Sequence, residues 1–510
     1  MGIYNRFWRS QGGGERHSGM VAELLARKGL EVDLLGHEEV DLDALGRHLG
    51  LDLSGCRLRV LPENGEQRLS EITAEYDLFV NGSYMSRLPS RAKRSAYLCY
   101  FPTPLGHDLA PWRRTASRVL GRHIRQVERT DVVYGIGWFP PEGGRRRSWT
   151  WTSGASELTL GAGPAVGLIF EAGRPGQSAT ELVVRLGGEE AFRTKVGPDF
   201  SHHEIALPES SSPRVLRFES ETFVSGPADT RELGVAVSRL RPSTASRDPR
   251  RVVAERFPWL LVEQLDDSYL DTYDVVLANS RFTRGWIRRF WRREAEVLYP
   301  PIQVERFHPA AERSPSIVVA GRFFAPRHGH SKRQLEQVQT FARMVDAGLL
   351  LGWTLHVIGG CEPSQRAYVD KVRAAGFGYR VELHVNAPRQ ELEDIMSTAS
   401  VVWSATGFGE DETDAPWASE HFGMTTVEAM AAGCVPVVID RAGQREIVRQ
   451  GMDGFRWTTL RELAERTVQI VLDDRLRARM SASSVARAQL YSDAAFARRL
   501  DDLVQRYELF

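Results

Sequence analysis

The sequence predicts an α/β protein with two strand–helix units and an all-β insertion. Short apolar strands alternate with amphipathic helical patterns over residues 1–135, and the same alternation returns after residue 300. This alternation is typical of parallel sheets. Residues 148–240 instead hold short alternating runs separated by Gly, Pro and Ser turns, which predict a small β-sandwich. The α/β pattern resumes at residues 273–278, so the sandwich is expected to be an insertion in the first unit.

The domain boundaries are expected where the pattern changes. Residues 1–139 and 250–305 would form an N-terminal Rossmann-like domain, and residues 140–245 the inserted β-sandwich. Residues 310–489 would form a second Rossmann-like domain, and a helix at about residues 490–510 is expected to pack back on the first. Ligands of such sheets bind at the carboxyl ends of the strands, so we expect a ligand in a cleft between the two domains.

The composition excludes several classes of protein. Of the 510 residues, 42% are hydrophobic and 26% are charged, which fits a globular protein and excludes wholesale disorder. The 66 basic side chains balance the 66 acidic ones, which argues against nucleic acid as a partner. The four cysteines have no C-x-x-C spacing, so a disulfide framework and a cysteine-based zinc site are excluded. No apolar run approaches the ~18 residues of a membrane span, and we expect a cytoplasmic protein.

The balanced total hides local charge. Residues 81–150 carry 13 basic and 4 acidic side chains, whereas residues 401–430 carry six acidic and no basic ones. Within the basic stretch, residues 111–129 predict a helix with an apolar face and many arginines. The apolar face would hold Val119, Leu120, His123, Ile124 and Val127. Such a helix can contact the inner face of an anionic membrane or bind an anionic acceptor. The alternative is a solvated basic face around a stripe of core residues.

The segment EHFGMTTVEAMAAGCVP, residues 420–436, carries the most chemical information. One interpretation is a capping box, with Thr425 and Glu428 opening a core helix. The other is a binding site, because backbone N–H groups at a helix N-terminus favour anionic or hydroxyl-rich ligands. Glu420 and Glu428 would flank that site, and carboxylates accept hydrogen bonds from sugar hydroxyls.

These motifs resemble one known family. Glu420 and Glu428 within EHFGMTTVEAMAAGCVPVV resemble the E-x7-E signature of retaining GT-B-fold glycosyltransferases of family four, the glycosyl transferases group 1. QGGGERHSGMVAELLARKGLEVDLL resembles the family's first Gly-rich loop and helix, and GRFFAPRHGHSKRQ its donor-phosphate loop. ANSRFTRGWI and VLYPPIQVERFHP resemble the end of its first domain and its linker. The resemblance implies a GT-B architecture, two Rossmann-like domains facing a cleft, and the sandwich lies outside it.

The resemblance also implies roles for charged residues. Arg322 and Lys332 would contact the diphosphate of a nucleotide-sugar donor. Preplaced cations stabilise a departing diphosphate more in the transition state than in the ground state, so neither a metal ion nor another cofactor is expected. Glu428 would hold the nucleotide ribose, and Glu420 the donor sugar. The alternative for the two cations is a solvated loop. The neighbouring donor-binding residues would be Phe422, Gly423, Met424 and Thr425.

The first domain would contribute a loop and an acceptor-side residue. Gly12 and Gly13 would let the loop approach the donor phosphates closely, although a tight strand–helix turn is the simpler interpretation. His17 replaces the third glycine of a dinucleotide fingerprint, which therefore fits poorly. The family often has a histidine near the reacting sugar; Tyr100 occupies the matching position here, and His107 is an alternative.

Two acidic segments are candidate metal sites. Asp41 and Asp43 have D-x-D spacing, and residues 410–414 form an acidic loop. Neither lies in the single-domain context in which a D-x-D metal motif works, so solvated acids are the favoured interpretation and no metal site is expected.

The sequence thus predicts a retaining, metal-independent hexosyltransferase of polysaccharide biosynthesis. Its donor would be a nucleotide sugar, with GDP-mannose preferred because EHFGM resembles mannosyltransferases. Its acceptor would be a hydroxyl of a glycan, a lipid-linked compound or a small molecule. Two alternatives stay open. One is a sugar-nucleotide epimerase of the same fold. The other is a non-catalytic carbohydrate- or lipid-binding protein that uses the basic helix and the sandwich aromatics Trp138, Trp149 and Trp151.

Overall fold

The computed structural model describes most of the chain in two compact units. The described residues are 1–10, 12–61, 66–104, 111–124, 132–135, 137–139, 142–143, 148–161, 165–208, 210, 212–226, 229–244, 250, 253, 256–257, 259–260, 267–326 and 330–509. Unit 1 comprises Met1–Val60, Ser70–Thr103 and Ser268–Phe510, and unit 2 comprises Leu61–Leu69 and Pro104–Asp267. Each unit is described by itself.

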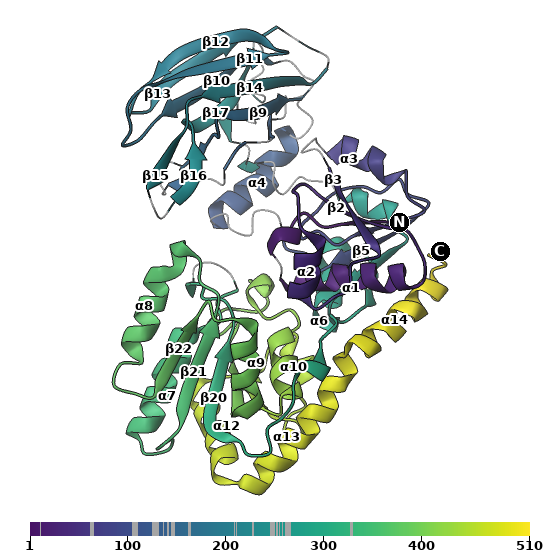
Figure 1. The fold of residues 1–510 in the computed structure, drawn as a ribbon, viewed down its shortest axis with the longest axis vertical. Helices are drawn as coiled ribbons and strands as arrows, with labels where there is room; N and C mark the ends of the chain where they lie inside the picture. The colour runs from purple at the N-terminus through teal and green to yellow at the C-terminus, as the bar shows by residue number, and fades with distance from the viewer. Residues whose placement is uncertain are drawn as a thin grey trace. The chain divides into compact units, whose positions relative to one another are not determined.

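Unit 1 contains a seven-stranded parallel sheet built from the N-terminal part of the chain (Figure 1). The strand order is β19-β18-β5-β4-β1-β2-β3. The strands are β1 (Gly2–Tyr4), β2 (Val32–Gly36), β3 (Cys56–Val60), β4 (Leu78–Asn81), β5 (Arg94–Cys99), β18 (Val275–Ala278) and β19 (Glu296–Val297). Since β1 lies between β2 and β4, the strand order reverses beside β1, and ligands of such sheets bind at the carboxyl ends there.

A second parallel sheet in unit 1 repeats this topology with six strands in the order β22-β21-β20-β23-β24-β25. The strands are β20 (Ser314–Ala320), β21 (Thr354–Gly359), β22 (Val381–Val385), β23 (Ala399–Ser404), β24 (Val435–Ile439) and β25 (Phe455–Trp457). All residues of β24 are buried, as expected for a valine-rich strand covered on both faces. The order reverses beside β20. In both sheets we therefore expect ligands at the loop that follows the first strand, β1 in one sheet and β20 in the other.

Helices cover both sheets (Figure 1). They are α1 (Gly13–Arg27), α2 (Leu42–Leu49), α6 (Arg281–Trp291), α7 (Gln334–Asp346), α8 (Arg366–Ala375), α9 (Arg389–Thr398), α10 (Met424–Ala431), α11 (Gln444–Ile447), α12 (Leu460–Leu472), α13 (Asp474–Ala488) and α14 (Asp493–Arg506). Helix α4 (Pro111–Ile124) belongs to unit 2, and α3 (Glu66–Thr73) has residues in both units. Short 3₁₀ segments are η1 (Trp8–Ser10), η3 (Ser268–Thr272), η4 (Val304–Arg306), η6 (Pro363–Gln365), η7 (Pro416–Ala418) and η8 (Gln489–Tyr491).

The last helix of the chain packs against the N-terminal sheet. Phe496, Leu500 and Leu503 of α14 are buried in the same core as Ile3 and Leu34. At the start of α14 the Arg16 Nη2 atom donates to both carboxylate oxygens of Asp493, at 2.6 and 2.7 Å. In Figure 1 the yellow helices α13 and α14 follow one another from the second sheet to the first. This ion pair joins two residues that lie 477 positions apart in the sequence.

Unit 2 is built around a β-sandwich of two five-stranded sheets, β13-β10-β17-β8-β7 and β12-β11-β14-β9-β6, with β15 and β16 as a separate pair. The strands are β6 (Val132–Tyr134), β7 (Glu142–Gly143), β8 (Ser148–Trp151), β9 (Ala155–Leu160), β10 (Ala165–Gly173), β11 (Thr180–Leu186), β12 (Glu189–Val196), β13 (Ser201–Ala206), β14 (Arg214–Ser220), β15 (Phe223–Gly226), β16 (Asp229–Leu233) and β17 (Ala236–Thr244). Burial alternates along β9, with Leu158 and Leu160 in the core between the sheets. The predicted fold class is therefore confirmed.

Some local predictions were wrong. The apolar run at residues 97–101 indicates a buried strand, but β5 ends at Cys99 because its neighbour β18 ends at Ala278 and offers no further partner. The neighbouring arginines at residues 145–147 indicate an exposed side chain at Trp151, but it is only 6% exposed in the structure.

The basic helix also differs from its prediction. Val119 and Leu120 of α4 are 49% and 52% exposed, whereas Ser117 is fully buried and donates its hydroxyl to the Leu260 carbonyl at 2.8 Å. The interpretation of a buried stripe is thus wrong at these two residues. Residue 127 of that stripe lies outside the described residues. Within the described part of the chain, no helix combines the length and the apolarity needed to span a membrane.

Candidate functional site

The structure brings two predicted site residues into direct contact. The Lys332 Nζ atom donates to Glu420 Oε2, and the Thr406 hydroxyl donates to the same oxygen at 3.2 Å. The two side chains remain 23% and 20% exposed, so a ligand can reach them. Burial by itself would raise the pKa of Glu420, but the charge and hydrogen bond of Lys332 outweigh it and the pKa lies below its usual value. The site therefore holds an ionised carboxylate beside a cation.

Helix α10 begins at Met424, four residues after Glu420. Gly423 caps this helix with φ +116°, in a region that favours glycine. A Cβ at this position would lie 2.9 Å from the Gln444 Nε2 atom. Phe422 is buried, with its ring centroid 5.4 Å from that of Tyr299. The first N–H groups of a helix have no carbonyl partner within it, so the turn at Met424 and Thr425 can donate to a ligand.

Glu428, one turn further along α10, is held by a different cation. Its Oε1 atom accepts from Arg389 Nη2 at 2.7 Å, and Arg389 also donates to Glu393 at 2.9 Å. The Glu428 side chain is only 13% exposed. The capping-box interpretation is not what the structure shows, because the cap of α10 is Gly423 and makes no side-chain hydrogen bond. Glu428 is therefore fixed by Arg389 of α9.

The predicted glycine loop meets α10 directly. Gly12 caps α1 and donates its N–H to Glu15 Oε2 at 2.7 Å, which closes the loop. A Cβ on Gly13 would lie 2.5 Å from the Met424 sulfur, so the loop approaches α10 as closely as glycine permits. The structure thus brings together motifs that lie about 410 residues apart in the sequence.

Tyr100 holds the glycine loop through hydrogen bonds to the start of α1. Its hydroxyl donates to the Gly14 carbonyl at 2.6 Å and lies 3.1 Å from the Ser18 hydroxyl. Burial raises its pKa well above the usual value, so the hydroxyl stays protonated at neutral pH. The structure therefore gives Tyr100 a positioning role for the loop. The alternative residue, His107, lies outside the described residues.

Arg322 follows β20 and is exposed, with its guanidinium 5.2 Å from the centre of the Phe324 ring. It lies in the same loop as Gly321 and Lys332; a Cβ on Gly321 would lie 2.8 Å from Lys332 Cγ. The cations Arg322 and Lys332 therefore belong to one loop at the carboxyl end of the first strand of this sheet.

The position of this loop depends on the close approach of Gly359, and a substitution there tests that dependence. A Cβ on Gly359 would lie 2.0 Å from the Gly321 carbonyl oxygen, whereas one on Gly360 would meet nothing closer than 3.7 Å. We expect Gly359→Ala to displace the loop and to cost about 1–3 kcal/mol of stability. Gly360→Ala is the matched control and should melt like the wild type. Equal melting temperatures for the two variants would contradict this account of the loop.

Sequence reasoning missed a second set of residues around the site. The His421 ring stacks on Phe101 with centroids 4.1 Å apart, and His330 lies edge-on to it at 4.4 Å. Burial and the nearby Lys332 charge lower the pKa of His330 to about 4, and burial lowers that of His421 well below its usual value. Both rings are therefore neutral at pH 7. His421 was visible in the EHFGM segment, but nothing in the spacing pointed to His330 or Phe101.

Glu446, on α11, is a further residue that the sequence did not indicate. Its carboxylate accepts from the backbone N–H groups of Arg281 and Phe282 at 2.9 and 2.7 Å, at the start of α6. It also accepts from the Tyr299 hydroxyl at 2.9 Å. A carboxylate at a helix N-terminus is favourable because of the positive end of the helix dipole. Glu446 thus joins α11 to α6, the helix that follows β18.

The acidic residues of the two candidate metal sites are bound by backbone N–H groups and by arginines. Asp41 caps α2 and accepts from the Asp43 and Ala44 N–H groups at 2.9 and 3.1 Å. In the acidic loop, Glu410 pairs with Arg333 and Glu412 accepts from Arg445 at 3.1 Å. Their positions are explained by capping and ion pairing.

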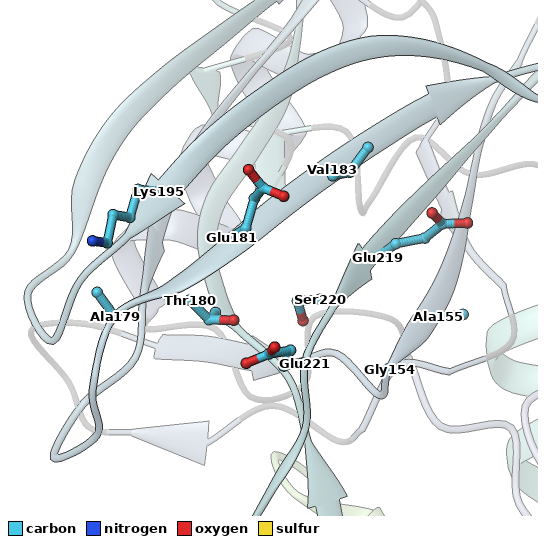
Figure 2. Close-up of a pocket in the computed structure, with 10 residues that line it drawn as sticks. All are labelled: Gly154, Ala155, Ala179, Thr180, Glu181, Val183, Lys195, Glu219, Ser220 and Glu221. Carbon is cyan, nitrogen blue, oxygen red and sulfur yellow. The ribbon is translucent and has the colours of Figure 1, made fainter.

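A separate hollow of about 770 Å³ lies on the sandwich of unit 2 (Figure 2). Its charged lining residues are Glu181, Lys195, Glu219 and Glu221. None of the ten residues that line it is aromatic, so it lacks the ring platform on which the sugar-binding hypothesis for the sandwich was based.

Comparison with solved structures defines the fold. Unit 1 has two parallel sheets of Rossmann-like topology, and the whole chain is similar to HepE of Anabaena in complex with UDP-glucose, with TM-score 0.51, 10% identity and 99% of each chain covered. It is also similar to sucrose-phosphate synthase from Thermosynechococcus elongatus, with TM-score 0.53 and 13% identity over 99% of this chain and 98% of that one. The fold is therefore the GT-B fold of glycosyltransferases.

Comparison of sequences then identifies one domain. Residues 306–486 match the family described as Glycosyl transferases group 1, so this segment, which holds Lys332, Glu420 and Glu428, is a domain of the family that the motifs predicted.

Relatives match about half of the chain. The GDP-Man:Man(3)GlcNAc(2)-PP-Dol alpha-1,2-mannosyltransferase of Neurospora crassa is 27% identical over 285 residues, covering 48% of each protein. The human protein of the same name is 28% identical over 250 residues, covering 44% of this chain and 46% of its own. The chain thus spans about half the length of the curated relatives it matches.

Proposed function

We propose that this protein is a glycosyltransferase that moves a hexose from a nucleotide sugar to a hydroxyl acceptor. The observation that carries the proposal is the Lys332–Glu420 pair beside the N-terminus of α10, inside the glycosyl transferases group 1 domain, where the Gly13 loop approaches Met424. A cation, an ionised carboxylate and donating N–H groups converge there. That combination suits a ligand that carries both phosphate and sugar hydroxyls.

The cations would act on the leaving group. When the bond between the sugar and the diphosphate breaks, negative charge grows on the departing phosphate, and Lys332 and Arg322 would stabilise it. Because they are placed in advance, their effect is larger in the transition state than in the ground state. In this proposal no metal ion takes part in the transfer.

The carboxylates would hold the two ends of the donor. Glu420, together with the backbone of residues 422–424, would bind the sugar. Glu428 would bind the ribose hydroxyls. Arg389 fixes the Glu428 carboxylate at 2.7 Å, so little side-chain entropy would be lost on binding.

We further propose that the transfer retains the configuration of the sugar. The acceptor hydroxyl would attack from the face that the diphosphate leaves. The bond from the anomeric carbon to the phosphate oxygen breaks, the bond to the acceptor oxygen forms, and the acceptor proton passes to the phosphate. No nucleophile from the protein is required in this scheme.

GDP-mannose is the proposed donor, because the matching relatives carry GDP-Man and mannosyltransferase in their names. Those names also include a PP-Dol-linked glycan, which supports a lipid-linked acceptor. The exposed Trp112, Val119 and Leu120 on the basic helix α4 would let the protein contact an anionic membrane surface at its inner face.

The proposal is tested by donor binding and product analysis with the purified chain. In a thermal-shift panel of GDP, UDP, ADP and dTDP sugars, one donor at 100 times its dissociation constant should stabilise the fold by about 2.7 kcal/mol. That donor should then yield a glycoside with a lipid-linked or soluble acceptor, offered with and without anionic vesicles. Release of an epimerised sugar nucleotide would instead favour an epimerase, and binding without turnover would favour a non-catalytic protein.

A further inference from the structure

A cluster of two histidines and one glutamate lies at the outer edge of the second sheet. His356 is on β21, and Glu382 and His384 are on the edge strand β22. In the parallel register His356 lies opposite Glu382, and Ile358 opposite His384, so the three side chains share one face. One ligand atom of each lies within 4.8 Å of the others, which places three groups that bind transition metals at one point.

Two of the three distances between these atoms are close to those of a tetrahedral ion. His356 Nδ1 lies 3.2 Å from His384 Nε2 and 3.4 Å from Glu382 Oε2, and the two β22 atoms are 3.8 Å apart. Zinc bonds of about 2.0–2.1 Å at tetrahedral angles put neighbouring ligand atoms about 3.3–3.4 Å apart. Octahedral bonds of that length would put them about 2.9 Å apart. All three separations exceed the octahedral value.

The surroundings orient one ligand in advance. Glu391, on α9, lies 2.5 Å from His384 Nδ1, so this nitrogen carries the proton and the Nε2 atom presents its lone pair to the cluster. Carboxylates hold metal-binding histidines in this way in many zinc sites.

We infer that His356, Glu382 and His384 bind one Zn²⁺ ion, with Glu391 as the positioning residue. Both histidine side chains are 17% exposed, whereas that of Glu382 is 57% exposed, so the fourth position of the ion faces solvent and would hold a water molecule. The ion would join the edge strand β22 to β21. This site is separate from Lys332 and Glu420 and is independent of the proposed transfer reaction.

The test is a metal titration of the tag-free full chain after treatment with a chelator. Zn²⁺ should bind at one equivalent, and Co²⁺ at the same site should give the visible absorption of tetrahedral cobalt; Mg²⁺ and Ca²⁺ should not compete. The double variant His356→Gln, His384→Gln should bind zinc more than about 100-fold more weakly, beyond the range that loss of an outer partner causes. Glu391→Gln should weaken binding by about 10–100-fold.

The chain offers a matched control in the neighbouring histidines of β13. The double variant His202→Gln, His203→Gln removes the same number of histidines from another strand and should bind zinc like the wild type. If the β21–β22 variant does not fold, Glu382→Gln on the half-exposed side chain carries the test and must weaken binding. Equal zinc affinity in the wild type and in these variants would overturn the proposal and leave Glu391, His384 and His356 as a hydrogen-bonded chain.

Discussion

Replacing Lys332 with alanine is expected to lower the turnover of sugar transfer by about 10²–10³-fold, the usual cost of removing one preorganised group that stabilises developing charge. Lys332 is the cation that the structure holds against Glu420 at the predicted donor site. If it stabilises the leaving diphosphate, the loss falls on kcat as well as on kcat/KM, because the interaction is stronger in the transition state. Steady-state kinetics with the donor found in the binding panel measure both.

A second variant separates this role from a purely structural one. Lys332→Ala leaves the Glu420 carboxylate without its cation, and burial would then raise the pKa of that carboxyl. In the double variant Lys332→Ala, Glu420→Gln the unpaired charge is absent. If the lysine only neutralised Glu420, the double variant would recover activity; if it acts on the leaving group, the double variant stays slow. The exposed Lys371 on α8 is the matched control, and Lys371→Ala should be fully active.

The candidate site could be predicted from the sequence where its residues lie in local motifs. Lys332 and Glu420 were identified in separate segments, yet the bond between them joins residues 88 positions apart and follows only from the fold. Arg389 escaped prediction for the same reason, since it reaches Glu428 from a neighbouring helix. Thr425 and Glu428 show the opposite failure: their spacing fits a capping box, but tertiary structure gives the cap of α10 to Gly423.

The fold could be predicted further than the burial of individual side chains. Alternating patterns identified both parallel sheets and the sandwich, because strand and helix periods are properties of the local sequence. Exposure depends on what a face meets. Val119 and Leu120 look like core residues on a helical wheel, but α4 buries the face of Ser117 instead. Trp151 looks exposed beside a run of arginines, but it packs in a small core with Leu233 and Ala236.

Replacing His17 with phenylalanine is expected to make the protein less sensitive to acid. His17 lies on α1, fully buried, with its ring 5.3 Å from Phe496 and 5.9 Å from Tyr100. Neither of its ring nitrogens has a hydrogen-bond partner among the described residues. Burial, together with the charge of Arg16, lowers its pKa from 6.5 to about 3. The native protein therefore keeps this ring neutral in a range where the unfolded chain protonates it.

The sign of the effect follows from proton binding. Between pH 6.5 and about 3 the unfolded state holds one more proton at His17 than the folded state. The contribution of His17 to the free energy of unfolding therefore has its full value above pH 6.5 and falls as the pH is lowered. At a slope of about 1.4 kcal/mol per pH unit, His17 alone would cost roughly 2 kcal/mol at pH 5.

Phenylalanine at position 17 keeps the ring contacts and cannot be protonated. Urea denaturation at pH 7.5 and pH 5 should therefore show a smaller loss in His17→Phe than in the wild type, by roughly 2 kcal/mol. His48→Gln, on the exposed face of α2, is the control and should behave like the wild type. An unchanged loss in His17→Phe would mean that the buried ring is not the acid-sensitive group, and that His330 and His421, which shift in the same direction, carry the effect instead.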